Sequence, residues 1–174
     1  MPPTSPAPLR PARTCRGAAK VLGLAALVAI LCACHKSGHD LLLKARSQLA
    51  SADYQQAIAT ARAGLHAEPS RMDAFGLELV LLEAHARGGD GESAKRQLVK
   101  LAELYPKQLS ATDYSSTAQQ LQEAGEGPAA IEVLDLGKKR HPDDPLIERM
   151  IAEAASGESS PEELDMLKSL GYIE

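Results

Sequence analysis

The segment ADYQQAIATARAGLHAEP, residues 52–69, decides the fold, because two later segments repeat its pattern. They are GDGESAKRQLVKLAELYP, residues 89–106, and GEGPAAIEVLDLGKKRHP, residues 125–142. Each segment ends in proline, with an alanine twelve residues earlier and an alanine or glycine seventeen residues earlier. The prolines lie 37 and 36 residues apart. A period of this length is typical of chains that stack helix pairs.

The shared positions have physical reasons. Glycine tolerates the left-handed backbone conformation that closes a first helix and lets the chain reverse. Alanine in a second helix allows two helices to approach closely, and proline ends that helix because it cannot continue the hydrogen-bond ladder. The small residues are Ala52, Gly89 and Gly125 at the turns, and Ala57, Ala94 and Ala130 in the second helices.

The composition favours helices over strands. The chain has no tryptophan, a single phenylalanine (Phe75) and many alanines and leucines. Apolar residues recur three and four apart in stretches such as residues 40–65, which is typical of amphipathic helices. No long alternation of β-branched residues is present, so strands have little support. The sequence therefore predicts an all-α fold.

The repeated pattern resembles the tetratricopeptide repeat, a helix pair of about 34 residues. The resemblance implies a helical-hairpin solenoid with three repeats in residues 41–142. It is degenerate, because only Tyr114 supplies the aromatic residue expected near the start of a first helix. Repeats two and three exceed the usual length of the family's repeat by two or three residues. We therefore expect irregular turns before them. A plain helical bundle remains the alternative.

Residues 143–174 are predicted to form capping helices, because the last repeat of a solenoid has no neighbour to cover its apolar face. Ser160 followed by Pro161 is a typical helix start, with acidic residues in the first turn. The ending LDMLKSLGYI, residues 164–173, also resembles the segment that closes the catalytic domain of many bacterial sulfatases. Their Cys-x-Pro-x-Arg signature is absent from this sequence, so the likeness implies no activity.

Residues 1–33 are predicted to be a cleaved signal peptide. Residues 1–20 contain four basic and no acidic residues, and residues 21–33 carry no charge. A basic segment followed by a short apolar core is the layout of a secretory signal. Thirteen apolar residues are few for a span, which needs about 20. An uncleaved anchor is the alternative.

The run LCAC, residues 31–34, resembles the lipobox of bacterial lipoproteins. The resemblance implies cleavage before Cys34, lipid on that cysteine, and a lipidated tether over residues 34–40. A cut before Cys32 would put Leu31 where a small residue is needed. Two or more acyl chains anchor a protein stably to a membrane. His35 stands where an aspartate would imply inner-membrane retention, so the resemblance favours the outer membrane, on its periplasmic side.

The two cysteines and two histidines between Cys32 and His39 also suggest a soft-metal site. Cleavage removes Cys32, and lipidation turns the Cys34 thiol into a thioether. Only His35 and His39 then remain, whereas a structural zinc site needs four ligands. The Cys-x-x-Cys-His pattern of c-type haem attachment is absent. We therefore expect no metal and no cofactor beyond the covalent lipid, and metal or haem delivery is the least favoured hypothesis.

The predicted mature chain, residues 34–174, excludes several further functions. Its 15 basic and 23 acidic residues give a net charge of −8, which disfavours nucleic acid as a partner. Its only cysteine is Cys34, so it can form no internal disulfide. The sequence contains no Gly-x-Ser-x-Gly, no phosphate-binding glycine loop and no His-Glu-x-x-His. We therefore expect no catalytic residues and no enzyme activity.

The resemblance implies a peptide-binding groove on the concave face, formed by the first helix of each pair. The family's lining positions lie 27, 23 and 20 residues before each proline. The set lacks the lysines and asparagines that clamp a chaperone's C-terminal carboxylate, and packing between repeats is the alternative for its leucines. The nine residues are Leu42, Arg46, Leu49, Leu79, Glu83, Ala86, Ser115, Gln119 and Gln122.

These features together predict a lipid-anchored periplasmic adaptor. Its partner would be an envelope protein or a peptide segment held in the groove, during envelope, pilus or secretion assembly. The alternative is a non-catalytic accessory or regulatory subunit of an envelope hydrolase, suggested by the sulfatase-like ending.

Overall fold

The structure is a computed structural model of the whole chain, and it describes residues 37–157 and 159–174. Within these residues it has eight helices and no strand, so the prediction of an all-α fold is confirmed. None of the helices in the described part is long and apolar enough to cross a membrane. The predicted signal peptide and Cys34 lie outside the described residues.

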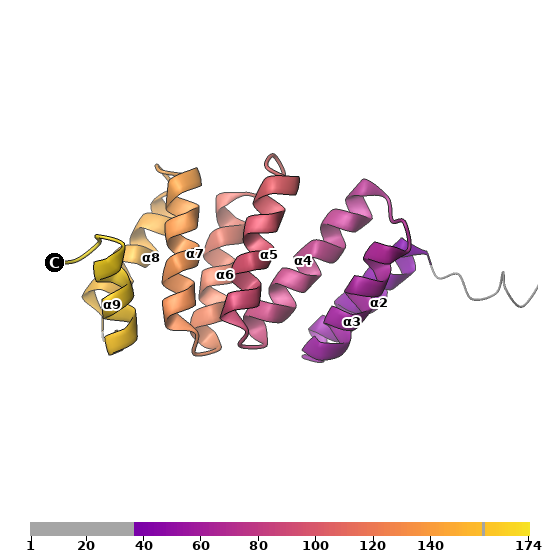
Figure 1. The fold of residues 1–174 in the computed structure, drawn as a ribbon, viewed down its shortest axis with the longest axis horizontal. Coiled ribbons are helices and arrows are strands. Elements are labelled where there is room, and N and C mark those ends of the chain that lie inside the picture. Colours follow the sequence, from indigo (N-terminus) through magenta and orange to yellow (C-terminus); the bar gives the residue numbers. More distant parts are fainter. Residues whose placement is uncertain (1–36, 158) are drawn as a thin grey trace, which may run out of the picture. The chain divides into compact units, whose positions relative to one another are not determined.

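The helices follow one another as four pairs (Figure 1). The pairs are α2 (Gly38–Ala50) with α3 (Tyr54–His66), α4 (Arg71–Arg87) with α5 (Gly91–Leu104), α6 (Ala111–Glu123) with α7 (Gly127–Arg140), and α8 (Pro145–Ser156) with α9 (Pro161–Ser169). The first helices contact one another in order, α2 with α4, α4 with α6, and α6 with α8. Among the second helices, α5 contacts α7 and α7 contacts α9, but α3 does not contact α5.

Helix α2 begins earlier than the sequence analysis placed it. The Ser37 hydroxyl accepts a hydrogen bond from the Asp40 backbone N–H, and the Asp40 carboxylate accepts one from the Ser37 backbone. This capping box satisfies N–H groups that would otherwise be unpaired at the helix start. The predicted tether over residues 34–40 therefore overlaps α2, because Gly38 to Asp40 lie in the helix and Ser37 is its N-cap. His39 is part of α2, and its Nδ1 lies 2.9 Å from Asp73 Oδ1 on α4.

The turn inside each of the first three pairs has the geometry predicted from the repeats. The backbone φ is positive at the three expected positions, Ala52 (58°), Gly89 (73°) and Gly125 (83°). In each turn the next residue donates its N–H to the carbonyl five residues earlier, which is the Schellman helix ending. These bonds run from Asp53 to Gln48, from Asp90 to His85 and from Glu126 to Leu121. The prediction of left-handed turns at these residues is confirmed.

The additional residues of repeats two and three lie in two different places. Helix α4 has 17 residues where α2 and α6 have 13, so repeat two is longer by one helical turn. Repeat three carries its additional residues in the connection 105–110, between α5 and α6. The expectation of an irregular turn is therefore met before repeat three, whereas repeat two absorbs its extra length inside a helix.

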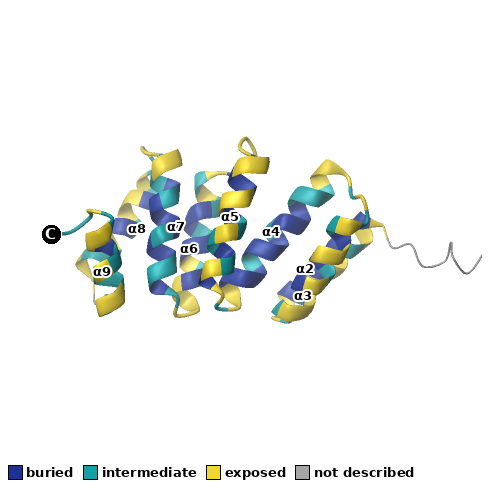
Figure 2. Cartoon of the chain, in the orientation of Figure 1, coloured by how far each residue is buried: buried dark blue, intermediate teal, exposed yellow. Residues whose placement is uncertain are grey.

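Most of helix α4 from Gly76 onward is buried, and the helix belongs to two hydrophobic cores (Figure 2). Leu77, Val80, Leu81 and Ala84 pack with α2 and α3. Leu82 and Ala86 pack with the helices from α5 onward. A helix with buried residues on several faces must be covered from several directions, and α4 is covered by α2, α3, α5 and α6.

The buried face of α4 includes one carboxylate, that of Glu78, which occupies a position where the resembled family has an aromatic residue. Lys100 Nζ on α5 lies 2.6 Å from Glu78 Oε1, and Gln97 Nε2 donates to Glu78 Oε2 at 2.5 Å. A buried carboxylate needs such partners because its desolvation is costly. The contact therefore ties α5 to α4 through polar atoms.

The C-terminal segment closes the stack. Ser160 and Glu163 form a capping box at the start of α9, and Leu167 in the same helix is fully buried. After α9 the chain turns at Gly171, whose φ is 81°. The Tyr172 hydroxyl then donates a hydrogen bond to Asp135 Oδ1 on α7 at 3.0 Å. The sulfatase-like ending is thus, in this chain, a helix and turn that pack on α7.

The left-handed turns give a matched pair of stability predictions. A methyl group at Gly125 would meet no atom within 4 Å, so Gly125→Ala tests the backbone conformation alone. We expect Gly125→Ala to lower the free energy of unfolding by about 0.5–1 kcal/mol, because alanine disfavours positive φ. Ala52→Gly should raise it by a similar amount, since alanine already bears that cost at Ala52. Urea denaturation with an unchanged m-value would measure both changes, and equal signs for the two variants would contradict the turn geometry.

Candidate partner-binding surfaces

The predicted groove on the first helices is mostly filled by packing. Four of the nine predicted residues have buried side chains, and Ser115 donates its hydroxyl to the Thr112 carbonyl. Leu79 is half-buried and packs against the core. These residues present little surface to a partner. The four buried residues are Leu42, Leu49, Ala86 and Ser115.

Each first helix contributes three of the nine predicted residues, and the middle one of each three has accessible surface. Arg46 and Gln119 are exposed, and Glu83 is half-buried and pairs with Arg87 at 3.1 Å. Gln122 is also exposed. Residues three and four positions apart share one helix face, so the buried members are covered there by the neighbouring helices. The surface that remains is the row of Arg46, Glu83 and Gln119, which we call the first-helix row, with Gln122 one turn further along α6.

A small hollow of about 140 Å³ lies on this face between α4 and α6. Two of the nine predicted residues, Leu79 and Glu83, line its α4 side, whereas Ser115 and Gln119 do not line its α6 side. The hollow is formed by the sides of α4 and α6 that face each other. The lining positions taken from the family lie on the outward face of each helix. Its lining residues are Leu79, Leu82, Glu83, Asp113, Ser116, Thr117 and Gln120.

Beside this row, Asp73 on α4 meets groups from several elements. The Ser70 hydroxyl and the His39 ring hydrogen-bond to its carboxylate and lower its pKa, and the charge of Arg46 acts in the same direction. The Asp73 side chain is only partly covered and His39 is exposed, so these contacts orient side chains at the start of α4 and add little stability.

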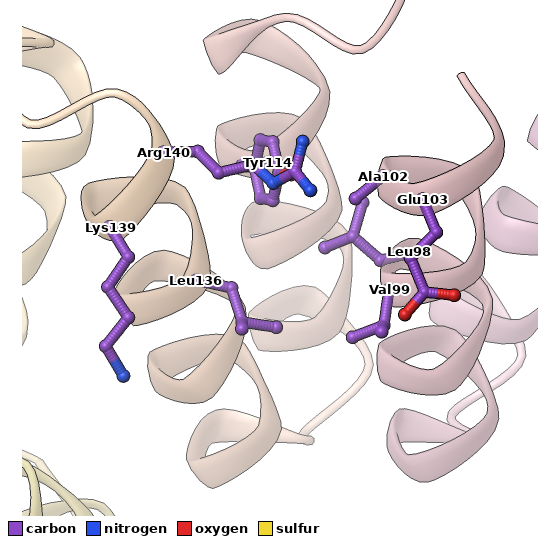
Figure 3. Close-up of a pocket in the computed structure, with 8 residues that line it drawn as sticks. All are labelled: Leu98, Val99, Ala102, Glu103, Tyr114, Leu136, Lys139 and Arg140. Carbon is purple, nitrogen blue, oxygen red and sulfur yellow. The ribbon is translucent and has the colours of Figure 1, made fainter. Parts of the chain in front are cut away.

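A second surface, which the sequence analysis missed, lies between the second helices α5 and α7 (Figure 3). Two hollows of about 200 and 400 Å³ share Val99 and Leu136, and we call them together the α5–α7 groove. Val99 from α5 and Leu136 from α7 face each other across it. Its lining residues are Leu98, Val99, Ala102, Glu103, Tyr114, Leu136, Lys139 and Arg140 in the first hollow, and Lys95, Arg96, Glu132, Asp135 and Leu170 in addition in the second.

Tyr114 of α6 forms the inner end of the α5–α7 groove. Its side chain is 1% exposed, and its hydroxyl has no hydrogen-bond partner among the described residues. The ring packs edge-on against His141, with 5.7 Å between the ring centroids. Burial raises the pKa of the Tyr114 hydroxyl, and the positive charge of Arg140 opposes that rise. A buried hydroxyl without a partner costs stability, so the arrangement is one that a ligand could complete.

The charged residues at the rim of the α5–α7 groove differ in their pairing. Lys95 contacts Glu132 at 2.5 Å and Glu92 at 2.8 Å. Lys139 contacts Asp135 at 2.6 Å. Arg140 forms no ion pair with the residues that the structure describes, and its side chain extends from the end of α7 toward Tyr114 (Figure 3). The rim therefore offers one guanidinium whose donors are available to a partner.

At the other end of the α5–α7 groove, the C-terminal segment forms part of the wall. Leu170 lines the groove, and Tyr172 hydrogen-bonds to Asp135 just beyond it. Burial, the hydrogen bond and the charge of Asp135 together raise the pKa of Tyr172 to about 12. The C-terminal cap thus positions one wall of the groove.

Within residues 37–157 and 159–174, no three histidine, cysteine or acidic side chains lie close enough together to hold a metal ion. No protein-family model, curated protein or solved structure matches the chain. The function is therefore inferred from the sequence motifs and from these two surfaces.

The raised pKa of Tyr172 predicts how the C-terminal cap responds to alkaline pH. We expect Tyr172→Phe to lower the free energy of unfolding by about 1–2 kcal/mol near pH 8, because it removes a hydrogen bond to a carboxylate. The folded state favours the neutral phenol, so this contribution is complete below pH 10, the ordinary tyrosine pKa. It is lost as the pH rises from 10 to about 12.

The measurement is urea denaturation of the wild type and Tyr172→Phe from pH 8 to 12. Tyr105→Phe is the control, because the Tyr105 hydroxyl makes no hydrogen bond to the described residues. A stability difference that stays constant across this range would contradict the assignment.

Proposed function

We propose that this chain is a lipid-anchored bacterial envelope protein whose tetratricopeptide-type repeats bind another envelope protein. It would act as an adaptor in envelope, pilus or secretion assembly, without catalysis and without a cofactor beyond the lipid on Cys34. The observation that carries the proposal is the position of the first described helix. Ser37 caps the first helix only three residues after the lipobox cysteine.

This spacing suits a short membrane tether. Only His35 and Lys36 would separate a lipidated Cys34 from the capped helix. A fully extended chain spans about 3.5 Å per residue, so the start of α2 would lie within roughly 10 Å of the acylated cysteine. Lipidation would then hold the helix pairs at the membrane surface, and the resemblance favours the periplasmic side of the outer membrane. The membrane would be contacted through the lipid.

The recurring turns and the accessible first-helix row support a binding role. Each of the first three helix pairs has a left-handed residue at the same place in its turn, followed by the same hydrogen bond. Such recurring turns are expected of a helical-repeat protein. Helical repeats form extended surfaces that bind peptide segments or other proteins. The row of Arg46, Glu83 and Gln119 offers polar side chains of different charge to such a partner.

The lipidation proposal has a matched pair of variants. Cys34→Ser should abolish incorporation of a clickable fatty acid in growing cells and move the protein from the membrane fraction to the soluble fraction, unless the signal remains uncleaved. Cys32→Ser should leave both unchanged, because serine is usual at the tolerant lipobox position. Labelling that survives Cys34→Ser and is lost with Cys32→Ser would overturn the assignment of Cys34.

The adaptor proposal is tested by crosslinking in the native cell and identifying partners by mass spectrometry. We expect one envelope protein to be captured by the wild type and lost with the charge-reversed pair Arg46→Glu and Glu83→Arg. The control is Arg149→Glu, at an exposed position on α8. A capture that is the same in all three proteins would rule out the first-helix row as the binding surface.

A further inference from the structure

We infer that the α5–α7 groove binds an acidic amphipathic segment of a partner protein, with its carboxylate between Arg140 and Tyr114 and its aliphatic side chains on Val99 and Leu136. The inference rests on the proposed adaptor function and adds a second surface and a partner chemistry to it. The surface lies mainly on the second helices α5 and α7, whereas the first-helix row lies on α2, α4 and α6.

The apolar part of the α5–α7 groove is accessible. Val99 is 40% exposed, and Leu104 near the end of the same helix is 51% exposed. Leu98, Ala102 and Leu136 continue the apolar lining inward (Figure 3). Covering exposed aliphatic surface contributes about 25 cal/mol per Å² of area removed from water. A partner segment with aliphatic side chains on one face would cover it.

The charged residues around the groove indicate the sign of the charge that a partner should carry. The lining of the α5–α7 groove carries four basic and three acidic side chains, whereas residues 37–174 carry 14 basic and 23 acidic residues. The groove therefore has a small excess of positive charge on an acidic protein, with Glu103 the acidic side chain in the first hollow. A partner with acidic side chains would be attracted to this surface and repelled by the rest of the molecule, which favours specificity.

Two hydrogen-bond donors in the first hollow favour a carboxylate as the partner's binding group. The Arg140 guanidinium has hydrogen-bond donors and no ion-pair partner among the described residues. The Tyr114 hydroxyl is buried in the same hollow, also without a partner in the described part of the chain. A carboxylate accepts hydrogen bonds from both groups and compensates the arginine charge, whereas a neutral acceptor would satisfy only the hydrogen bonds.

The test is peptide display on the full-length protein in mild detergent. A library of random twelve-residue peptides is selected, and the most enriched peptide is synthesised with a fluorescent label for anisotropy measurements. We expect enriched sequences to combine aspartate or glutamate with leucine, isoleucine or valine at helical spacing. Replacing the acidic residues of the peptide with their amides should weaken its binding by about tenfold or more.

Protein variants identify the site on the chain. Arg140→Gln should weaken binding of the synthetic peptide by about tenfold, and Tyr114→Phe by about fivefold. Val99→Asp should abolish binding. The matched control Arg149→Gln, on α8, should have no effect. Tyr114→Phe should also leave the urea midpoint of the free protein unchanged or higher, because it deletes a buried hydroxyl that has no partner.

Three results would overturn the inference. They are enriched peptides that are basic or uncharged, an acidic peptide whose binding is unchanged by Arg140→Gln and Val99→Asp, and Arg140-dependent binding to vesicles of anionic phosphatidylglycerol in place of peptides. The adaptor proposal is judged separately, because crosslinked capture that depends on Arg46 and Glu83 would stand even if the α5–α7 groove bound no peptide.

Discussion

The burial of several faces of α4 is the constraint on which the arrangement of the other helices depends. Most helices of a small domain have one apolar face and one polar face, but α4 has buried residues on several faces. It therefore requires neighbours in several directions, and α2, α3, α5 and α6 supply them. Both hydrophobic cores include residues of α4, so neither could keep its present form without this helix. The buried Glu78 shows that even polar groups here are paired with a neighbour, Lys100.

Much of the fold was predictable because its decisive features are local. A left-handed residue at a turn, a capping serine and a proline after a helix act over a few neighbouring residues, so their sequence pattern is readable. This is why the turns at Ala52, Gly89 and Gly125 were predicted by residue. The start of α2 was placed too late because the capping box of Ser37 and Asp40 was not recognised. The added turn of α4 was missed because it arises from packing between pairs, which no short motif encodes.

The candidate sites were less predictable, because they depend on which flanks of the helices meet. The family offsets identified Arg46, Glu83 and Gln119 as accessible residues, and they also named Leu42 and Ser115, whose side chains are buried. The offsets assume that the groove has the geometry of the resembled family. In this chain four of the nine positions are buried: Leu42, Leu49, Ala86 and Ser115. The α5–α7 groove had no motif, since Val99 and Leu136 look like ordinary core positions in the sequence. The unpaired hydroxyl of Tyr114 is visible only in three dimensions.

The lack of contact between α3 and α5 has a mechanical consequence. Helices α2 and α3 contact each other and α4, and no other helix of the described part. A pulling force that enters at the start of α2 must therefore pass through α4 before it reaches the α5–α7 groove. The first helix pair therefore lies in the path of any force that runs from the start of α2 to α5 and the later helices. It can yield under load while the larger core around α5 to α8 keeps its shape.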